Sequence, residues 1–318
     1  MTMELASVRV VRKPWGKTDL RPWSELGHDG APIGELWFER AESTAPEPAL
    51  LLKLLFTDEP LSIQVHPDDI FAHSIGLPHG KTEAWSVLSA TPGAQIALGL
   101  KRSVTLPQLR AAIADGSIAD LAHWQPAHPG EAILVTAGTI HALGAGLVIA
   151  EIQQRSDATF RLFDYGRNRE LHLDGAVGAA TAGPAIAQVV PERLSEARLV
   201  LARSPYFVLE QIDLAPNSNW DVNAGAETWL LLTGGDAKFD LLHASSGEAV
   251  YIDGHRARIQ AGEHGAKGLM AYAASEPIAT LLQSRNGEAR ETVVTRVPEL
   301  AAKRPVPVPL VNERGIRA

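Results

Sequence analysis

The sequence predicts an all-β protein that consists of two β domains with a small helical insertion. Short apolar segments rich in Val, Ile and Leu recur along the chain, and Gly, Pro, Asn and Asp interrupt them. Such segments, repeated about every ten residues, are typical of strands in sandwiches and barrels. The chain has 318 residues and is 45% hydrophobic, which suffices for two cores of ordinary size.

The predicted strands follow this punctuation along the chain. They span residues 49–56, 61–65, 83–88, 94–98, 132–135, 147–153, 206–214, 228–233 and 278–282. Helical character is confined to residues 106–115 and 117–121, where Thr105 ahead of Pro107 has the pattern of a helix start.

Changes in composition suggest where the domains end. We expect a first β domain over residues 1–175, a small-residue linker over 176–190, a second β domain over 191–285 and a Pro-rich tail over 286–318. No tandem repeat is visible, as expected for two β domains whose sequences have diverged.

Composition also excludes several classes of protein and site. The chain has no cysteine, so any metal must bind to nitrogen and oxygen ligands. A net charge of -8 argues against broad nucleic-acid binding, which needs a basic surface. No segment approaches the ~20 apolar residues of a membrane span or has the form of a signal peptide. We expect a cytoplasmic protein without a membrane or nucleic-acid partner, and the oligomeric state stays open.

The segment LSIQVHPDD, residues 61–69, carries the first informative pattern. Side chains two residues apart in a strand share a face. Gln64 and His66 therefore project together, while Ile63 and Val65 project from the opposite face. The amide and the imidazole can reach one point.

Two later segments extend this pattern. GKTEAW places Lys81 and Glu83 two residues apart at the start of another strand, and PGEAILVTAGTIHALG presents His141 after an apolar run and a Gly-rich turn. Two imidazoles, one carboxylate and one amide oxygen form a ligand set suited to zinc, and also to iron, manganese or cobalt.

Each of these residues also has an ordinary interpretation. A lone histidine such as His66 is more often a hydrogen-bonded core or surface residue than a ligand, and glutamine is an uncommon ligand. Glu83 or Lys81 alone would be a solvated charge at a strand edge. Only the joint pattern favours a metal site.

The joint pattern resembles type I mannose-6-phosphate isomerases, in their compact bacterial form. The matching segments occur in the family's order over about the first half of the chain: KPWG, IGELW, LLLKLLF, LSIQVHPDD, GKTEAW, AGTIHALGAG and EIQQRSDATFRLFDYGR. The resemblance implies two cupin-like domains, each a double-stranded β-helix or jelly roll. It also implies metal-dependent interconversion of mannose 6-phosphate and fructose 6-phosphate.

The resemblance further implies roles for individual residues. One Zn²⁺ ion per chain would be held by Gln64, His66, Glu83 and His141. A sugar phosphate would be bound by Lys53, Ser62 and Asp157, although Lys53 also suits a strand edge and Asp157 a turn. Arg161 and Lys81 would be catalytic.

The reaction itself defines what these residues must supply. Moving a proton between C1 and C2 through a cis-enediol(ate) requires a base and a positive charge near the oxygens. Arg161 suits the fixed charge. Lys81 beside a dication is our first choice of base, with Lys53, Asp157 and a zinc-bound water as alternatives.

The second half of the chain contains no QxH or GTxHA segment, so we expect its domain to bind no metal. Two other functions stay open. Another metal-dependent cupin isomerase or oxygenase would use a similar site, usually with more histidines. A non-catalytic sugar-binding cupin would tolerate loss of the ligands, all of which are present. No glycine-rich nucleotide-binding loop is found.

Overall fold

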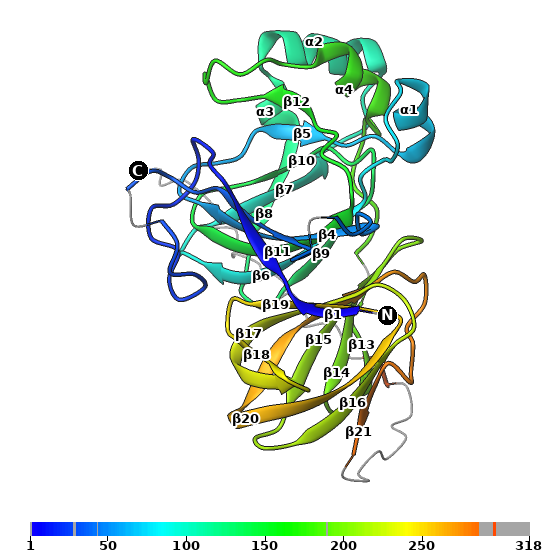
Figure 1. The fold of residues 1–318 in the computed structure, drawn as a ribbon. Coiled ribbons are helices and arrows are strands. Elements are labelled where there is room, and N and C mark those ends of the chain that lie inside the picture. Colours follow the sequence, from blue (N-terminus) through cyan, green and yellow to red (C-terminus); the bar gives the residue numbers. More distant parts are fainter. Residues whose placement is uncertain (1, 28–29, 43, 189, 286–294, 297–318) are drawn as a thin grey trace, which may run out of the picture.

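The computed structural model describes residues 2–27, 30–42, 44–188, 190–285 and 295–296. The described strands form three antiparallel sheets, arranged as two β units that lie one above the other in Figure 1. The upper unit contains a six-stranded and a five-stranded sheet, and we call it the N-terminal unit. The lower unit is one eleven-stranded sheet, the C-terminal unit.

The N-terminal unit contains the segments that carry the sequence motifs. Its six-stranded sheet has the order β2 (Ser7–Val11), β3 (Glu35–Glu39), β4 (Leu50–Thr57), β11 (Leu147–Gln154), β6 (Glu83–Ala90) and β9 (Ala132–Val135). Its five-stranded sheet has the order β12 (Phe160–Phe163), β5 (Ile63–Val65), β10 (His141–Leu143), β7 (Gln95–Leu100) and β8 (Ala122–Pro126).

The C-terminal unit also includes the first strand of the chain, β1, which pairs with β19. Its eleven strands are β1 (Thr2–Leu5), β13 (Glu192–Ser195), β14 (Arg198–Arg203), β15 (Val208–Leu214), β16 (Asn219–Ala224), β17 (Thr228–Phe239), β18 (Leu242–Ser245), β19 (Ala249–Asp253), β20 (His255–Tyr272), β21 (Leu282–Ser284) and β22 (Thr295–Arg296).

Four short helices belong to the N-terminal unit, and α2, α3 and α4 lie at its outer end in Figure 1. They are α1 (Asp69–Ser74), α2 (Leu106–Asp115), α3 (Ile118–Leu121) and α4 (Leu173–Ala179). In α2, Thr105 and Gln108 form a capping box and Gly116 ends the helix at φ 82°. No helix in the described part of the chain is long and apolar enough to cross a membrane.

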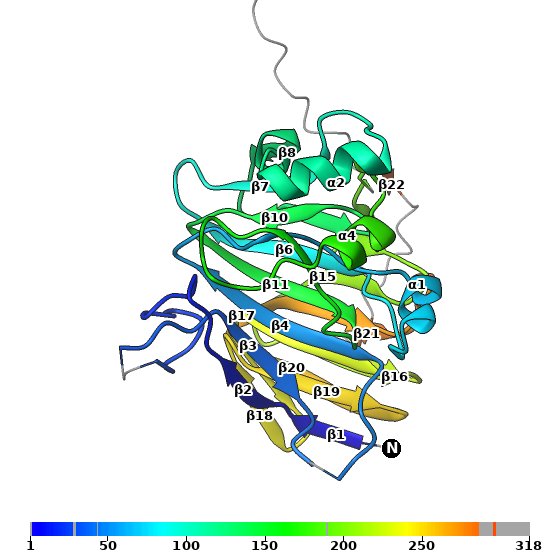
Figure 2. The same ribbon diagram turned by 90° about the horizontal axis from the view of Figure 1, so that it is seen from above.

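The two units share a hydrophobic core, which explains why β4 is apolar on both faces. Leu52 and Leu54 pack in one cluster with Trp229 and Leu231 of the C-terminal unit. The alternate residues of β4 point to the other face, where Lys53 lines a cavity. The layered arrangement is visible from above in Figure 2, where β4 and β11 lie over strands of the C-terminal unit.

The structure confirms the all-β class, the two predicted helices and eight of the nine predicted strands, which correspond to β4, β5, β6, β7, β9, β11, β15 and β17. The strand predicted at 278–282 is wrong except for its last residue. The backbone there bonds to side chains instead of a ladder: Arg198 donates to the carbonyl oxygens of Ile278 and Ala279, and Ile278 N–H donates to the Tyr272 hydroxyl.

Several elements were not predicted. The long strand β20 alternates polar and apolar residues over HRARIQ, so it lacks an apolar run. Helix α4 lies at the start of the predicted linker, because alanines that fit a linker also favour a helix. The predicted domain boundaries stay predictions, and apart from β22 the predicted tail, 286–318, lies outside the described residues.

Candidate metal and substrate site

Strand register in the five-stranded sheet brings three of the predicted residues into one row. Gln64 in β5 lies opposite His141 in β10 on one side and opposite Arg161 in β12 on the other. His66 follows directly after β5, so it lies on the same side as Gln64, while Ile63 and Val65 pack into a separate core cluster. The predicted facing of these four residues is confirmed.

The six-stranded sheet contributes the second row. Glu151 in β11 lies opposite Lys53 in β4 and opposite Trp85 in β6, and Gln153 lies opposite Glu83. The two rows meet between the sheets, so acidic and basic side chains from one sheet face the imidazoles of the other.

Glu83 and the two imidazoles form the centre of the site. The nearest ligand atoms of His66, Glu83 and His141 all lie within 4.8 Å of one another, and each imidazole Nε2 is 3.4 Å from a Glu83 carboxylate oxygen. Each Nδ1 lies 2.8 Å from a backbone carbonyl oxygen, that of Ala158 or Thr139. A carbonyl only accepts hydrogen bonds, so each Nδ1 carries the proton and each Nε2 directs a lone pair at the carboxylate.

The electrostatics of this triad favour three unprotonated groups. Burial is the main cause that lowers the pKa of His66, to about 3, and it also lowers the pKa of His141. Burial raises the pKa of Glu83, but Lys81 and the two imidazoles outweigh it and hold that pKa well below the ordinary value. Within the described part of the chain, His66 Nε2 is buried and has no hydrogen-bond partner. Three electron-pair donors with no proton among them fit a cation.

The side chain of Gln64 fits a metal after one rotation. Its amide nitrogen lies 3.3 Å from His141 Nε2, and its oxygen accepts a hydrogen bond of 3.1 Å from Ser62 Oγ. Turning the amide by about 180° exchanges the nitrogen and the oxygen without moving the rest of the side chain. The Ser62 hydroxyl can donate or accept, so it supports either orientation.

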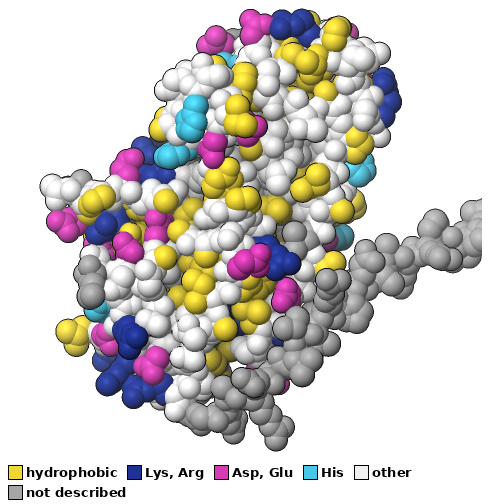
Figure 3. Space-filling model, turned by 90° about the vertical axis from the view of Figure 1, so that its right-hand side faces the viewer, with side chains coloured by type: hydrophobic (Ala, Val, Ile, Leu, Met, Phe, Trp, Pro, Cys, Tyr) yellow, Lys and Arg dark blue, Asp and Glu magenta, His cyan; other side chains and the backbone are white. Residues whose placement is uncertain are grey.

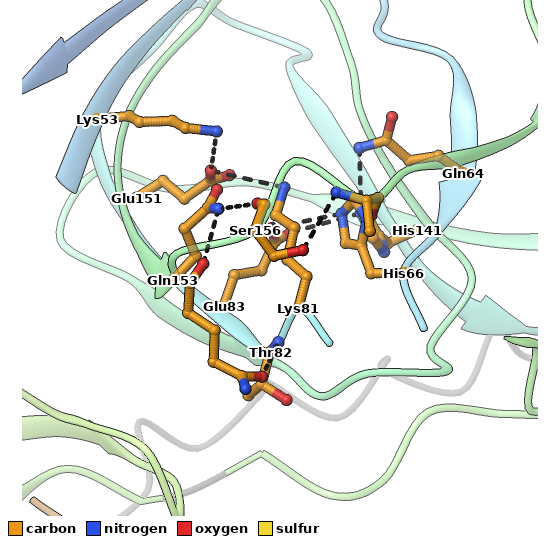
Figure 4. Close-up of polar contacts among 12 residues, drawn as sticks. Lys53, Gln64, His66, Lys81, Thr82, Glu83, His141, Glu151, Gln153 and Ser156 are labelled. Carbon is orange, nitrogen blue, oxygen red and sulfur yellow. Dashed lines mark hydrogen bonds and ion pairs between the residues drawn. The ribbon is translucent and has the colours of Figure 1, made fainter. Parts of the chain in front are cut away.

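Alternating lysines and carboxylates extend from the triad across the other sheet (Figure 4). Lys81 Nζ lies 2.9 Å from Glu83 and 3.9 Å from Glu151. Lys53 Nζ lies 3.3 Å from Glu151 and 3.8 Å from Glu35. All five side chains are buried, and each charge has a partner of opposite sign.

This alternation shifts two pKa values that matter for proton transfer. Burial alone would lower the pKa of Lys81, but Glu83 and Glu151 outweigh it and raise that pKa. Burial and then Glu83 raise the pKa of Glu151, against the opposing effect of the lysines. Without a metal, Lys81 is therefore an ammonium, and Glu151 is a stronger base than an ordinary carboxylate.

A second group of charges lies around Arg161, which lines the same cavity as the lysines. Arg161 Nη1 donates to the carbonyl oxygen of Glu170 at 2.6 Å, while its Nε is buried and has no partner among the residues that the structure describes. The backbone N–H of Arg161 donates to His172 Nδ1 at 3.1 Å. Burial, and next the neighbouring Arg169, lower the pKa of Arg161, which nevertheless stays charged at working pH.

These groups line a cavity of about 290 Å³. It is lined by eight of the nine predicted residues, Lys53, Ser62, Gln64, Lys81, Glu83, His141, Asp157 and Arg161, with His66 beside them in the triad. The volume lies near the lower end of the range for small-molecule sites.

The cavity is also lined by titratable residues with no role predicted from the sequence: Lys13, Glu35, Glu151, Arg169 and His172. Lys13, Glu35 and Glu151 occur in the motifs KPWG, IGELW and EIQQ, so their chemistry was visible. The burial of Glu35 and Glu151 was not visible, because it depends on the pairing of β3, β4 and β11.

Comparison with known proteins supports the motif resemblance. The chain is 37% identical over 195 residues to a mannose-6-phosphate isomerase of Streptococcus mutans, over 57% of this chain and 61% of the relative. It is 39% identical over 136 residues to mannose-6-phosphate isomerase ManA of Bacillus subtilis, over 40% of this chain and 42% of the relative. No protein-family model matches the chain.

Solved structures show the same fold over most of the chain. The mannose 6-phosphate isomerase from Bacillus subtilis superposes with a TM-score of 0.73 at 24% identity, over 85% of this chain and 99% of that one. A variant of phosphomannose isomerase from Salmonella typhimurium gives 0.68 at 17% identity, over 86% of this chain and 100% of that one. The predicted cupin-like fold and the family resemblance are confirmed, while the sequence matches span less than two thirds of either curated relative.

Proposed function

We propose that this chain is a zinc-dependent isomerase that interconverts mannose 6-phosphate and fructose 6-phosphate. The observation that carries the proposal is the buried triad of His66, Glu83 and His141, without a proton between its groups, beside a cavity lined by lysines and arginines. The curated relatives named as mannose-6-phosphate isomerases support this substrate and reaction.

The triad would hold the metal together with Gln64 after rotation of its amide. Nitrogen and oxygen ligands of this kind suit Zn²⁺, and the tautomers of both imidazoles are already set by the carbonyl groups at their Nδ1 atoms. When bound, a divalent ion supplies positive charge that stabilises negative charge on a sugar oxygen.

The cavity residues would move protons and bind the substrate. From mannose 6-phosphate, the C2 proton leaves, its bonding pair stays on carbon, and a cis-enediol(ate) forms as O1 gains a proton. A proton then adds to C1 and the O2 proton is lost, which gives fructose 6-phosphate. We assign the proton transfer at carbon to Lys81, because a dication on Glu83 weakens the attraction that raises the lysine's pKa. Before that transfer Glu151, 3.9 Å from Lys81 Nζ, would take the proton of the lysine ammonium. The neutral amine would then accept the C2 proton and return a proton to C1.

Substrate binding is assigned to Lys53, Ser62 and Asp157, and the stabilisation of charge to Arg161. Arg161 offers a buried Nε–H without a partner in the described structure, so it can donate to an anionic oxygen without losing another bond.

Of the remaining predictions, the cytoplasmic location and the absence of a nucleic-acid partner stay predictions. The face in Figure 3 carries charges of both signs.

Activity and metal content measured on one preparation test the proposal. Purified protein is assayed with mannose 6-phosphate, fructose 6-phosphate and glucose 6-phosphate, before and after removal of the metal by a chelator and after addition of Zn²⁺. We expect interconversion of the first two, loss of it on chelation and recovery with zinc. Full turnover by protein shown to be metal-free would contradict the proposal. Turnover of an unrelated substrate with the metal present would favour another cupin activity.

A further inference from the structure

The segment of residues 80–83 carries Lys81 and Glu83, and it is held on its far side by a separate set of hydrogen bonds. Gly80 N–H donates to Asp69 Oδ1 at 2.7 Å, and Thr82 N–H donates to the side-chain oxygen of Gln154 at 2.9 Å. Figure 4 shows Thr82 below Lys81 and Glu83, on the side away from Glu151.

Asp69 and Gln154 are linked to each other and to the C-terminal unit. The amide nitrogen of Gln154 donates to Asp69 Oδ1 at 3.1 Å, and the hydroxyl of Tyr206 donates to Asp69 Oδ2 at 2.7 Å. Tyr206 lies just ahead of β15, in the unit without the metal triad. Its hydroxyl thus connects that unit to the hydrogen bonds of Asp69 and Gln154.

The 80–83 segment packs closely against the backbone of residues 67–69, which leaves little space for it to move. A Cβ atom at Gly80 would lie 2.5 Å from the backbone carbon of Asp68 and 2.7 Å from the backbone nitrogen of Asp69. The backbone N–H of Lys81 also donates to the carbonyl oxygen of Pro67, at 2.9 Å. Because Gly80 N–H bonds to Asp69 Oδ1 within this close fit, a rotation of the Asp69 carboxylate moves the acceptor that holds the segment carrying Lys81.

We propose that Tyr206 is a positioning residue for the metal site, which acts by fixing the Asp69 carboxylate and through it the 80–83 segment. The inference rests on the proposed function, since it gives the C-terminal unit a part in metal binding. Among the described residues Asp69 accepts three hydrogen bonds, two at Oδ1 and one, from Tyr206, at Oδ2. Loss of the phenol hydroxyl leaves the carboxylate held at Oδ1 alone, so that it can turn about that atom. Glu83 then meets the two imidazoles in a less defined position.

The protonation states support a lasting bond. Burial, and next the hydrogen bond with Asp69, raise the pKa of Tyr206 to about 12. Burial would raise the pKa of Asp69, but hydrogen bonds from Gly80, Tyr206 and Gln154 outweigh it and lower that pKa. Near neutral pH the phenol is a donor and the carboxylate an acceptor.

Tyr206→Phe tests the inference, with Tyr272→Phe as the matched control. Tyr272 is a buried tyrosine of the same unit whose hydroxyl bonds to Glu210 and to Ile278 N–H, away from the site. Zinc affinity is measured by competition with a chelator, and kcat and KM in the zinc-loaded enzyme. We expect Tyr206→Phe to weaken zinc binding by about 10-fold, at the low end for outer-shell partners, and to lower kcat more than it changes KM. Tyr272→Phe should lower the melting temperature and leave zinc affinity unchanged.

A double-mutant cycle with Asp69→Ala tests the route of the effect. If Tyr206 acts through Asp69, Tyr206→Phe adds nothing to the loss of zinc affinity in Asp69→Ala. Fully additive losses, or a Tyr206→Phe variant with the zinc affinity of the wild type, would overturn the inference.

Amide hydrogen exchange supplies a readout that needs no metal. Tyr206→Phe should speed exchange at Gly80 and Thr82, which bond to Asp69 and Gln154, and Tyr272→Phe should not. Unchanged exchange at both amides would refute the positioning role. Absence of zinc binding by the wild-type protein would instead refute the proposed function.

Discussion

Replacing Glu83 by Gln removes the only anionic member of the proposed ligand set while preserving its shape. The side chain is 1% exposed, so solvent screens its charge only weakly. A carboxylate oxygen bound to Zn²⁺ lies about 2.1 Å from the ion. Coulomb's law for charges of +2 and -1 at that distance gives about 4 kcal/mol even at the dielectric constant of water. Because about 1.4 kcal/mol corresponds to a factor of ten, zinc affinity should fall at least about 1,000-fold.

The assay is a titration of metal-free protein with zinc in the presence of a competing chelator. Glu35→Gln is the control, because Glu35 is a buried carboxylate of the same charged cluster, 3.8 Å from Lys53, that lies outside the triad. It removes the same charge and should change zinc affinity by less than about 10-fold, the lower bound for residues that support ligands. If Glu83→Gln binds zinc as tightly as Glu35→Gln does, Glu83 is not a ligand.

Two further predictions concern the charges around the triad. Arg161→Ala should keep its zinc and its melting temperature and lose kcat by about 10²-fold to 10³-fold, with partial recovery in Arg161→Lys; a loss confined to KM would make Arg161 a ground-state anchor. The metal-free protein should lose stability on acidification from about pH 6.5 toward 3, because the pKa of His66 falls from 6.5 to about 3 on folding and the unfolded chain then binds more protons. The depressed pKa of Glu83 adds to this loss below 4.5. Denaturant unfolding at pH 7 and pH 5 measures the slope, and equal stability at the two values would contradict a neutral buried His66.

Much of the candidate site was predictable because strand alternation is a local property. The spacing of Gln64 and His66, and of Lys81 and Glu83, places each pair on one face wherever the strand lies in the sheet. The helix at 106–115 was predictable for the same reason, since its capping box and its terminal glycine lie within the element.

The remaining parts depended on partners far away in sequence. Glu151 is buried because β11 lies between β4 and β6, where it stands opposite Lys53 and Trp85. Tyr206 reaches Asp69 across 137 positions of the chain, which no local pattern reports. The segment at 278–282 has the composition of a strand, yet Arg198 and Tyr272 take its backbone hydrogen bonds.

The sequence by itself determined the donor chemistry of this protein: nitrogen and oxygen ligands, no thiolates, and lysines and an arginine near them. Only the tertiary structure decided which of these groups meet. The register that places His141 and Arg161 on either side of Gln64 is set by long-range strand pairing. Burial between two sheets then excludes water from the triad, and that exclusion holds the imidazoles neutral and makes their lone pairs available to a cation.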